Sequence, residues 1–315
     1  VMAPYVKLKR ENLTLSGSLS TQVGSQHSVK IGGEYQRFTM RNFSMNNENV
    51  FKLAGLLAKN DALPTGDTQK LTREQVIINT GVNNYGYDVF GDESNADGVT
   101  APKHPIFSSV YVQDKVEFKD LVLNMGLRFD HINSDSKVFA DPSFPDNTIN
   151  KETGEIYQDM VGPVDSGLVS VSPFNSISPR IGMSFPVTDR TVFHTQYGKF
   201  VQQSRLADIF QGYYATGSNI RGGLFIGAPV GFDLRPTRTT QYEIGFTQQI
   251  SDFASFDITG YYKDILDQIV YDQQNVRTGS KFGAYAVLRN GDFATTKGVE
   301  LTFNMRRTKR MQMNA

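Results

Sequence analysis

The sequence predicts a transmembrane antiparallel β-barrel, and three observations support that fold class. Residues 121–131 alternate, with apolar Leu121, Leu123, Met125, Leu127 and Phe129 at one parity and mostly polar residues at the other. Because successive side chains of a strand point to opposite faces, this segment has one apolar face. The same pattern recurs in segments of roughly ten residues, the length of a membrane-spanning strand. Short and long connections alternate between these segments, as in outer-membrane barrels.

Nine strands are expected along the chain, with a tenth if part of 281–290 pairs. In order they are 13–22, 29–40, 107–118, 121–131, 178–185, 190–200, 238–250, 253–266 and 295–305. Short connections fall at 23–28, 119–120, 186–189 and 251–252, and long ones at 43–106, 132–177, 202–237 and 267–290. We expect the long connections to be extracellular, because they share one end of the strands. A jelly roll or a propeller would use shorter strands and mix its connection lengths more evenly.

The composition is compatible with such a barrel. The mean hydropathy of −0.36 is low, but only alternate residues of a barrel face lipid and long polar loops dilute the average. No stretch approaches the roughly 18 apolar residues of a spanning helix, and residues 53–58 are far too few. Lys plus Arg equals Asp plus Glu at 32 each, which argues against a dedicated nucleic-acid binder. The absence of cysteine excludes disulfide, iron–sulfur and cysteine–zinc chemistry.

Charged residues on the polar faces indicate a wide barrel. They include Lys30, Glu34, Arg128, Asp130, Glu243, Asp257 and Glu300. In a dry core such groups would be very costly unless all were paired. We therefore expect a wet or plugged interior.

Four longer segments carry a family resemblance. They are YVQDKVEFKDLVLNMGLRFD (111–130), SPRIGMSFPVTDRTVFHTQYGKF (178–200), LRPTRTTQYEIGFTQQISDFASFDITGYYKDILDQIV (234–270) and NGDFATTKGVELTF (290–303). Over residues 107–305, and more weakly over 1–42, the chain resembles TonB-dependent outer-membrane receptors. Among these it most resembles the Oar-like, or carboxypeptidase-regulatory-like, subgroup.

The resemblance implies a barrel of about 22 strands closed by an N-terminal plug that carries a TonB box. Neither plug nor box is found in this sequence, which holds about half of those strands. We therefore interpret residues 1–315 as an incomplete barrel section of a longer protein, with the plug domain and the C-terminal strands outside it.

The implied function is energised uptake of a bulky nutrient across the outer membrane, and not enzyme activity. The implied partners are the TonB energy-transducing complex, reached through the plug, an extracellular nutrient ligand and outer-membrane lipid, with no cofactor. The alternatives are a passive porin or surface-adhesion barrel and, third, an outer-membrane protease.

The glycine- and aromatic-rich segment 212–232 is the candidate substrate-binding loop. Tyr213 and Tyr214 are expected to stack on a ligand, and Arg221 lies in the same loop. The competing interpretation, which the residues favour, is a loop that folds over its own barrel mouth.

Other candidate sites have simpler interpretations. His27, His104, His131 and His194 show no metal-ligand spacing, and Asp130 and His131 point to opposite faces as strand neighbours. Residues 92–98 (DESNADG) are rich in oxygen ligands but lack the calcium-loop register, which favours a solvated loop. The basic run 306–310 is expected to be a charged periplasmic turn beside the membrane.

Overall fold

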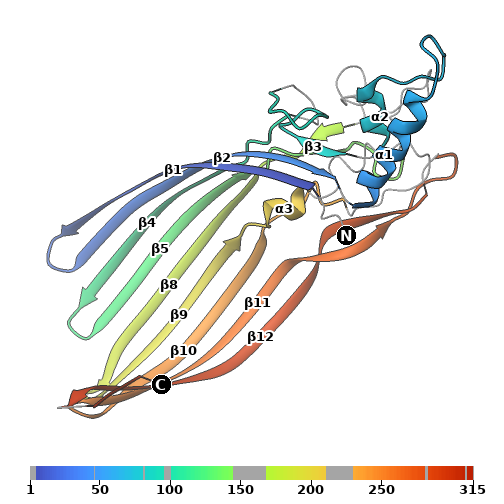
Figure 1. The fold of residues 1–315 in the computed structure, drawn as a ribbon. Coiled ribbons are helices and arrows are strands. Elements are labelled where there is room, and N and C mark those ends of the chain that lie inside the picture. The colour runs from blue at the N-terminus through green and yellow to red at the C-terminus, as the bar shows by residue number, and fades with distance from the viewer. Residues whose placement is uncertain are drawn as a thin grey trace.

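The chain forms one large antiparallel sheet with its loops gathered at one end (Figure 1). The computed structural model describes residues 5–45, 47–80, 82–95, 101–144, 168–210, 230–280, 283–308 and 311–314. Its main sheet has eleven strands in the order β1-β2-β4-β5-β8-β9-β10-β11-β12-β13, with β3 paired to β2 outside this path. Along this order, each long strand pairs with the long strands that precede and follow it in the sequence, which is an up-and-down arrangement.

Nine strands are long. They are β1 (Tyr5–Val23), β2 (His27–Met45), β4 (Ile106–Phe118), β5 (Leu121–Asn133), β8 (Phe174–Thr188), β9 (Thr191–Gln202), β10 (Thr237–Ser251), β11 (Ala254–Gln274) and β12 (Tyr285–Thr308). The short strands are β3 (Asn83–Tyr85), β6 (Lys137–Phe139), β7 (Leu168–Ser170) and β13 (Met311–Asn314). The prediction of about nine long strands is confirmed, and so is the alternation of short and long connections.

The short connections all lie at one end of the sheet, called here the turn end, and the long ones at the other, called the loop end. Lys119 and Asp120 form the predicted tight turn between β4 and β5. The turn between β1 and β2 contains Gly24 at φ +64°, a backbone conformation that glycine adopts without steric cost.

Several strands extend further toward the loop end than predicted. β1 begins at Tyr5 and not at residue 13, β2 continues to Met45, and β11 continues to Gln274. The segment 281–290 does not add a tenth strand, because from Tyr285 it is the beginning of β12 and pairs with the end of β11. Backbone pairing continues there after the apolar alternation has stopped, since strand hydrogen bonds do not require a lipid-facing side chain. The register shifts around Asp267 mark where the alternation breaks.

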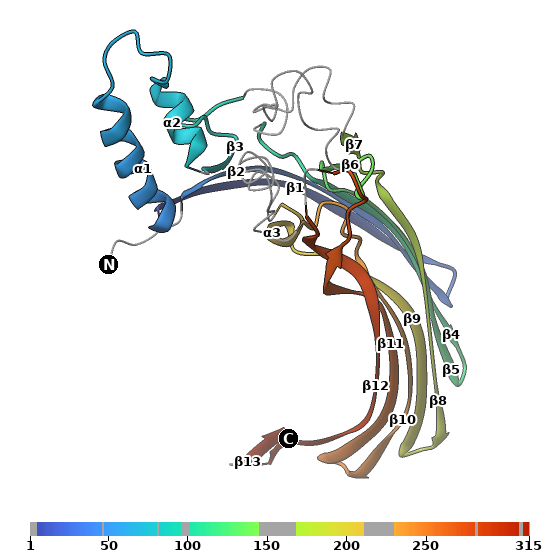
Figure 2. The same cartoon turned by 90° about the vertical axis from the view of Figure 1, so that its right-hand side faces the viewer.

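The sheet is a curved wall and not a closed cylinder (Figure 2). β1 lies at one edge of its strand order and β13 at the other, and these two strands do not pair. The helices α1 (Asn47–Asp61), α2 (Arg73–Asn79) and α3 (Leu206–Ile209) all lie at the loop end. Among the residues that the structure describes, no helix has the length and apolar character needed to cross a membrane.

Among the described residues, both clusters of buried apolar side chains lie at the loop end, and Val116 near the turn end of β4 belongs to neither cluster. The larger group, called here the mouth cluster, contains Met40, Tyr85, Phe139, Leu206, Ile209, Phe210, Val230, Phe232, Leu234, Tyr285 and Val287. A smaller cluster of Phe43, Met45, Val82 and Tyr87 packs with residues of α1 and α2. The described parts of the long connections are therefore folded and anchored on the extended ends of the strands.

Candidate functional site

The outer face of the wall carries an apolar band. On β1 the outward residues run from Leu13 to Val23 and include Leu19, which is 71% exposed. Toward the loop end the same face changes to Glu11 and Lys9. Corresponding bands run over Leu121–Phe129 on β5 and Tyr242–Ile250 on β10. Each is about nine to eleven residues long, the length that a tilted spanning strand needs. Such exposure of large apolar side chains would be unfavourable in water and is expected in lipid.

Aromatic rings stack across this band at two levels. Near the turn end, the rings of Phe185, Phe193 and Phe246 form a ladder with centroid separations of 5.1 and 5.2 Å. Nearer the loop end, Tyr197, Tyr242 and Tyr262 form a second row, called here the tyrosine row, with separations of 5.1 and 6.3 Å. The tyrosine row lies where the band ends toward the loop end, and amphipathic rings at such a border are typical of outer-membrane barrels.

One acidic residue interrupts the apolar band, and sequence reasoning missed it. Asp114 has the parity of Val112 and Val116 and lies beside Met125 on β5. Its carboxylate lies 2.7 Å from Nδ1 of His27, near the turn end of the wall. Parity alone would have identified Asp114 as an outlier on the lipid side.

The inner face is polar, as predicted. Arg128 donates to Asp130 over 2.8 Å, and the Thr259 hydroxyl donates to Asp257 over 2.7 Å. Nε2 of His194 lies 3.0 Å from the Thr259 hydroxyl. A groove of about 380 Å³ follows this face, with the cations Lys30, Lys115 and Arg180 among the amides Gln113, Asn124, Gln196 and Gln241. This surface suits a wet or plugged interior.

The mouth cluster covers the inner side of the wall at the loop end. It joins residues from β2, β3, β6, α3, residues 230–234 and the start of β12. Burial raises the pKa of Tyr85 to about 12, and it raises the pKa of Tyr285 further, so both phenols stay neutral. The Tyr285 hydroxyl donates to the carbonyl of Pro142 over 2.8 Å, which ties the second loop to β12.

A buried lysine lies in the first long loop. Lys103 is only 4% exposed, and its backbone pairs with that of Met40 on β2. Burial lowers the pKa of Lys103 to about 8, against a smaller opposing effect of the Asp135 carboxylate. The first loop is thus held to the wall close to the mouth cluster.

A cavity of about 450 Å³ opens among the second and third long loops. Its lining combines hydroxyl and amide groups with apolar side chains: Ile132, Ser134, Val138, Ser170, Val171, Ser172, Pro173, Phe174, Asn175, Gln203, Asp233, Leu234, Arg235 and Pro236. Both side-chain polar atoms of Gln203 are buried, and neither has a hydrogen-bond partner among the described residues. Because buried amides are normally paired, Gln203 is an exception in the wall of this cavity.

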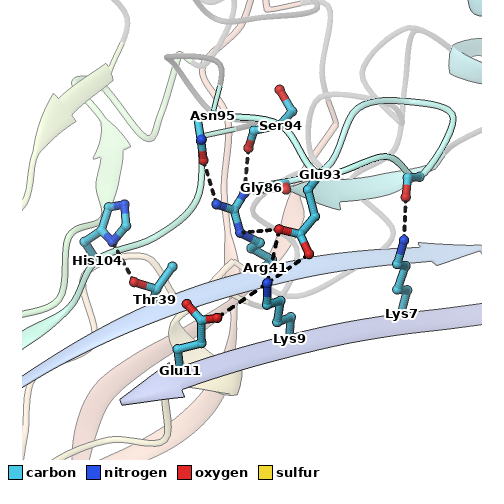
Figure 3. A network of polar contacts seen from close by, with 11 residues as sticks. Lys7, Lys9, Glu11, Thr39, Arg41, Gly86, Glu93, Ser94, Asn95 and His104 are labelled. Atoms are coloured by element: carbon cyan, nitrogen blue, oxygen red, sulfur yellow. Dashed lines mark hydrogen bonds and ion pairs between the residues drawn. The ribbon is translucent and has the colours of Figure 1, made fainter. Parts of the chain in front are cut away.

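A polar network fastens residues 86–95 to the outer side of the β1–β2 hairpin (Figure 3). Arg41 donates to the carbonyls of Gly86 and Ser94, each over 2.7 Å, and to Oδ1 of Asn95 over 2.6 Å. Lys9 donates to Glu93 over 2.9 Å and thereby holds the pKa of that carboxyl below its usual range. Glu93 belongs to the segment 92–98, and in the described part of that segment its carboxylate is paired with a cation from β1.

The predicted substrate residues Tyr213, Tyr214 and Arg221 lie outside the described residues. The described end of segment 212–232 is buried, with Val230 at 6% and Phe232 at 2% exposure in the mouth cluster. The ligand contact expected of the rest of the segment stays a prediction.

The histidines behave as separate groups. His131 pairs with Asn175 over 2.8 Å, whereas Asp130 pairs with Arg128, which confirms that these neighbours face opposite sides. Nδ1 of His104 lies 3.3 Å from the Thr39 hydroxyl. Among the described residues, no three His, Asp or Glu side chains are grouped to hold a metal ion. Of the basic run 306–310, the first three residues end β12 at the turn end, and Lys309 and Arg310 lie outside the described residues.

Solved outer-membrane proteins have the same architecture. The outer membrane transporter YddB from Escherichia coli matches with a TM-score of 0.53 at 12% identity, over 98% of this chain and 33% of that one. The siderophore receptor PirA from Pseudomonas aeruginosa matches with a TM-score of 0.52 at 14% identity, over 96% of this chain and 41% of that one. A mutant of the ferric enterobactin receptor PfeA from the same organism, in complex with enterobactin, matches with a TM-score of 0.51 at 16% identity, over 95% of this chain and 34% of that one. The chain spans about a third to two fifths of these proteins' lengths.

No curated protein matches the sequence. A family model described as "TonB dependent receptor-like, beta-barrel" matches residues 3–314, nearly the whole chain. That match agrees with a wall that is apolar outside and polar inside, with the tyrosine row and with the folded described parts of the loops. The chain therefore belongs to the TonB-dependent receptor β-barrel family and is a section of an outer-membrane barrel.

Proposed function

We propose that this chain is part of the barrel of a receptor that takes up a bulky nutrient across the outer membrane, with energy delivered through TonB. The observation that carries the proposal is the combination of a polar, unpacked inner wall with a mouth covered by folded loops. A barrel that passes small solutes by diffusion needs an open mouth. A covered mouth instead suits a ligand that is first bound and then released inward.

The loop end is extracellular in this proposal, and the plug domain and remaining strands lie in other parts of the receptor. The plug would fill the polar interior and reach the TonB complex, and membrane lipid would contact the apolar band. The similar structures include a siderophore receptor and a ferric enterobactin receptor, which supports a scarce, bulky ligand as the substrate class.

Ligand contact is proposed for the loops around the 450 Å³ cavity and for the segment that holds Tyr213, Tyr214 and Arg221. The unpaired amide of Gln203 supports the first location. The second rests on the sequence alone, since aromatic rings and a guanidinium are common anchors for ligands.

The test is growth of cells that depend on the full-length receptor for a single nutrient, with and without TonB. Energised uptake predicts that loss of TonB abolishes growth at low nutrient concentration and leaves growth at high concentration unchanged. Uptake independent of TonB would favour the passive porin, and surface binding without uptake would favour the adhesion barrel.

Ligand location is tested by Gln203→Leu, which keeps the side-chain size but removes both polar atoms. We expect weaker nutrient binding with unchanged receptor abundance. Gln249→Leu, at the turn end of β10, is the matched control and should bind normally. Equal binding by all three proteins would remove Gln203 from the site.

A further inference from the structure

A second concave feature lies on the outer side of the wall. It is a groove of about 750 Å³, called here the outer groove, which crosses β8 to β12. Each of these strands contributes two outward residues that flank one inward residue, as Tyr242 and Ile244 flank Glu243 on β10. The groove therefore opens toward lipid and not toward the interior.

The lining of the outer groove is apolar and aromatic. It contains all three members of the tyrosine row together with Leu123, Ile181, Met183, Ile244 and Val299. Gly260 lies in the floor, where a Cβ atom would meet only the carbonyl of Ile244, at 3.8 Å. The missing side chain thus leaves room along the middle of the groove, with a shape and polarity that suit an acyl chain.

A single cation lines the outer groove. Lys297 lies opposite Tyr262 on the neighbouring strand and is exposed. Among the residues that the structure describes, no carboxylate forms an ion pair with its ammonium group. The nearby outward acid is Asp264, two residues beyond Tyr262 toward the loop end of β11. Its carboxylate accepts a hydrogen bond from the Thr295 hydroxyl over 3.0 Å.

The height of Lys297 matches that of a lipid headgroup. The continuous apolar band ends at Tyr242 on β10 and at Tyr262 on β11, where Asp264 follows, and the exposed Leu266 lies beyond that acid. An acyl chain in the groove would therefore place its headgroup beside Lys297, at the border of the leaflet that meets the loop end. Basic groups at this level bind lipid phosphates.

We propose that the outer groove binds a phosphate-bearing lipid, with an acyl chain over Gly260 and a phosphate held by Lys297. This site goes beyond nutrient uptake, because it lies on the other side of the wall. A second outward groove, of about 550 Å³ around Gly17 and Gly33, has no lysine or arginine in its lining. It can accommodate acyl chains but offers no charge for a headgroup.

The two grooves provide a matched pair of variants. Gly260→Leu fills the outer groove without a backbone clash, and Gly17→Leu places the same side chain where a Cβ meets nothing within 4 Å. Lys297→Gln removes the charge, and Lys297→Arg retains it. Full-length receptor is purified from outer membranes, stripped of lipid and incubated with lipid A or with dephosphorylated lipid A. Native mass spectrometry then measures the lipid bound.

We expect wild-type receptor, Gly17→Leu and Lys297→Arg to bind lipid A about tenfold better than its dephosphorylated form. Gly260→Leu should bind neither form well, and Lys297→Gln should lose the preference for phosphate. Absence of a phosphate preference in the wild type, or equal binding by Gly260→Leu and Gly17→Leu, would overturn the proposal. If Gly260→Leu fails to assemble, the comparison of Lys297→Gln with Lys297→Arg still tests the phosphate site. Nutrient uptake is not part of the readout, so the two proposals can fail separately.

Discussion

At the scale of single residues, position along a strand decides which solvent a side chain meets. Leu127 is 48% exposed on the lipid side, whereas its neighbour Arg128 faces the interior and pairs with Asp130. A shift of one residue would move every side chain of β5 to the wrong face. Single substitutions therefore test the orientation of the whole strand.

Leu127→Arg should prevent assembly of the full-length receptor. A charge on the outer face of a barrel near the midplane costs about 2–4 kcal/mol. The neighbours of Leu127 on the adjacent strands are Val112 and Pro179, which offer no counter-charge. Heat-modifiable mobility on gels measures assembly.

Met125 has the same parity but is a poorer probe. Sequence parity predicts that Met125→Arg impairs assembly, yet the structure places Asp114 directly opposite, where it can pair with a new guanidinium. The control for Leu127→Arg is Asn124→Arg, which points into the polar interior and should assemble normally. If Leu127→Arg and Asn124→Arg impaired assembly equally, the two faces of β5 would be assigned incorrectly.

Because Lys103 is buried, the free energy of unfolding of the receptor should increase as the pH rises from 8 toward 10. The pKa of Lys103 is about 8 in the folded chain, against 10.5 for an exposed lysine. Between these values the unfolded chain binds more protons, so the free energy of unfolding rises with pH. It is constant below pH 8, where both states are protonated, and the full change is about 3 kcal/mol.

Thermal unfolding of the purified receptor at pH 7.5 and 9.5 measures this effect. Lys103→Met removes the titrating group, so its melting temperature should change less with pH than that of the wild type. Lys119→Met, in the exposed β4–β5 turn, should retain the wild-type pH dependence. A Lys103→Met curve that follows the wild type would assign the pH dependence to other groups.

At the scale of elements, the described parts of the long connections are folded and fixed to strand ends. Residues 86–95 depend on Arg41, whose side chain is 11% exposed and bonded to three acceptors. The planar guanidinium supplies several donors in one rigid fork, which a lysine cannot reproduce. The β1–β2 hairpin therefore positions the first loop before any ligand arrives.

Arg41→Met should loosen this loop while the barrel remains assembled. Loss of these charge-assisted hydrogen bonds should cost about 2 kcal/mol of local stability. Hydrogen–deuterium exchange over residues 86–95 should become faster, whereas exchange in β5 should not change. Arg37→Met, an exposed arginine on the same strand, is the control, and equal acceleration by both would refute the role of Arg41.

The two ends of the wall should also differ in accessibility on living cells. An epitope tag near Asn95, in the first long loop, should be labelled on intact cells, and so should one at Gly217 in the third. A tag at Asp120, in a two-residue turn, should be labelled only after the outer membrane is opened. Labelling of Asp120 on intact cells would invert the proposed orientation.

At the scale of the whole molecule, the wall has two unsatisfied edges. Among the described strands, none pairs with β1 on its free side, and the other edge ends with the four residues of β13. In lipid, each unpaired backbone group costs several kcal/mol, because no water is present to satisfy it. Curvature in Figure 2 leaves a wide gap between these edges.

Residues 1–315 alone should consequently fail to form a stable membrane pore. After refolding in detergent, we expect aggregation or association between edges. Gel mobility with and without heating, together with conductance in planar bilayers, measures this. A heat-modifiable monomer that conducts ions would mean that these strands can close by themselves.

The sequence alone determined the fold class, the family and the faces of most strands, since alternation with a period of two is a local property that lipid and interior enforce independently. It located the tight turns and the polar interior for the same reason. Only the tertiary structure decided what depends on distant partners. The strand extensions beyond the membrane, the mouth cluster, the unpaired Gln203 and the Asp114–His27 pair arise from contacts between residues far apart in the chain. The outer groove is of this kind as well, because five strands must lie in register before the absence of a side chain at Gly260 becomes a space.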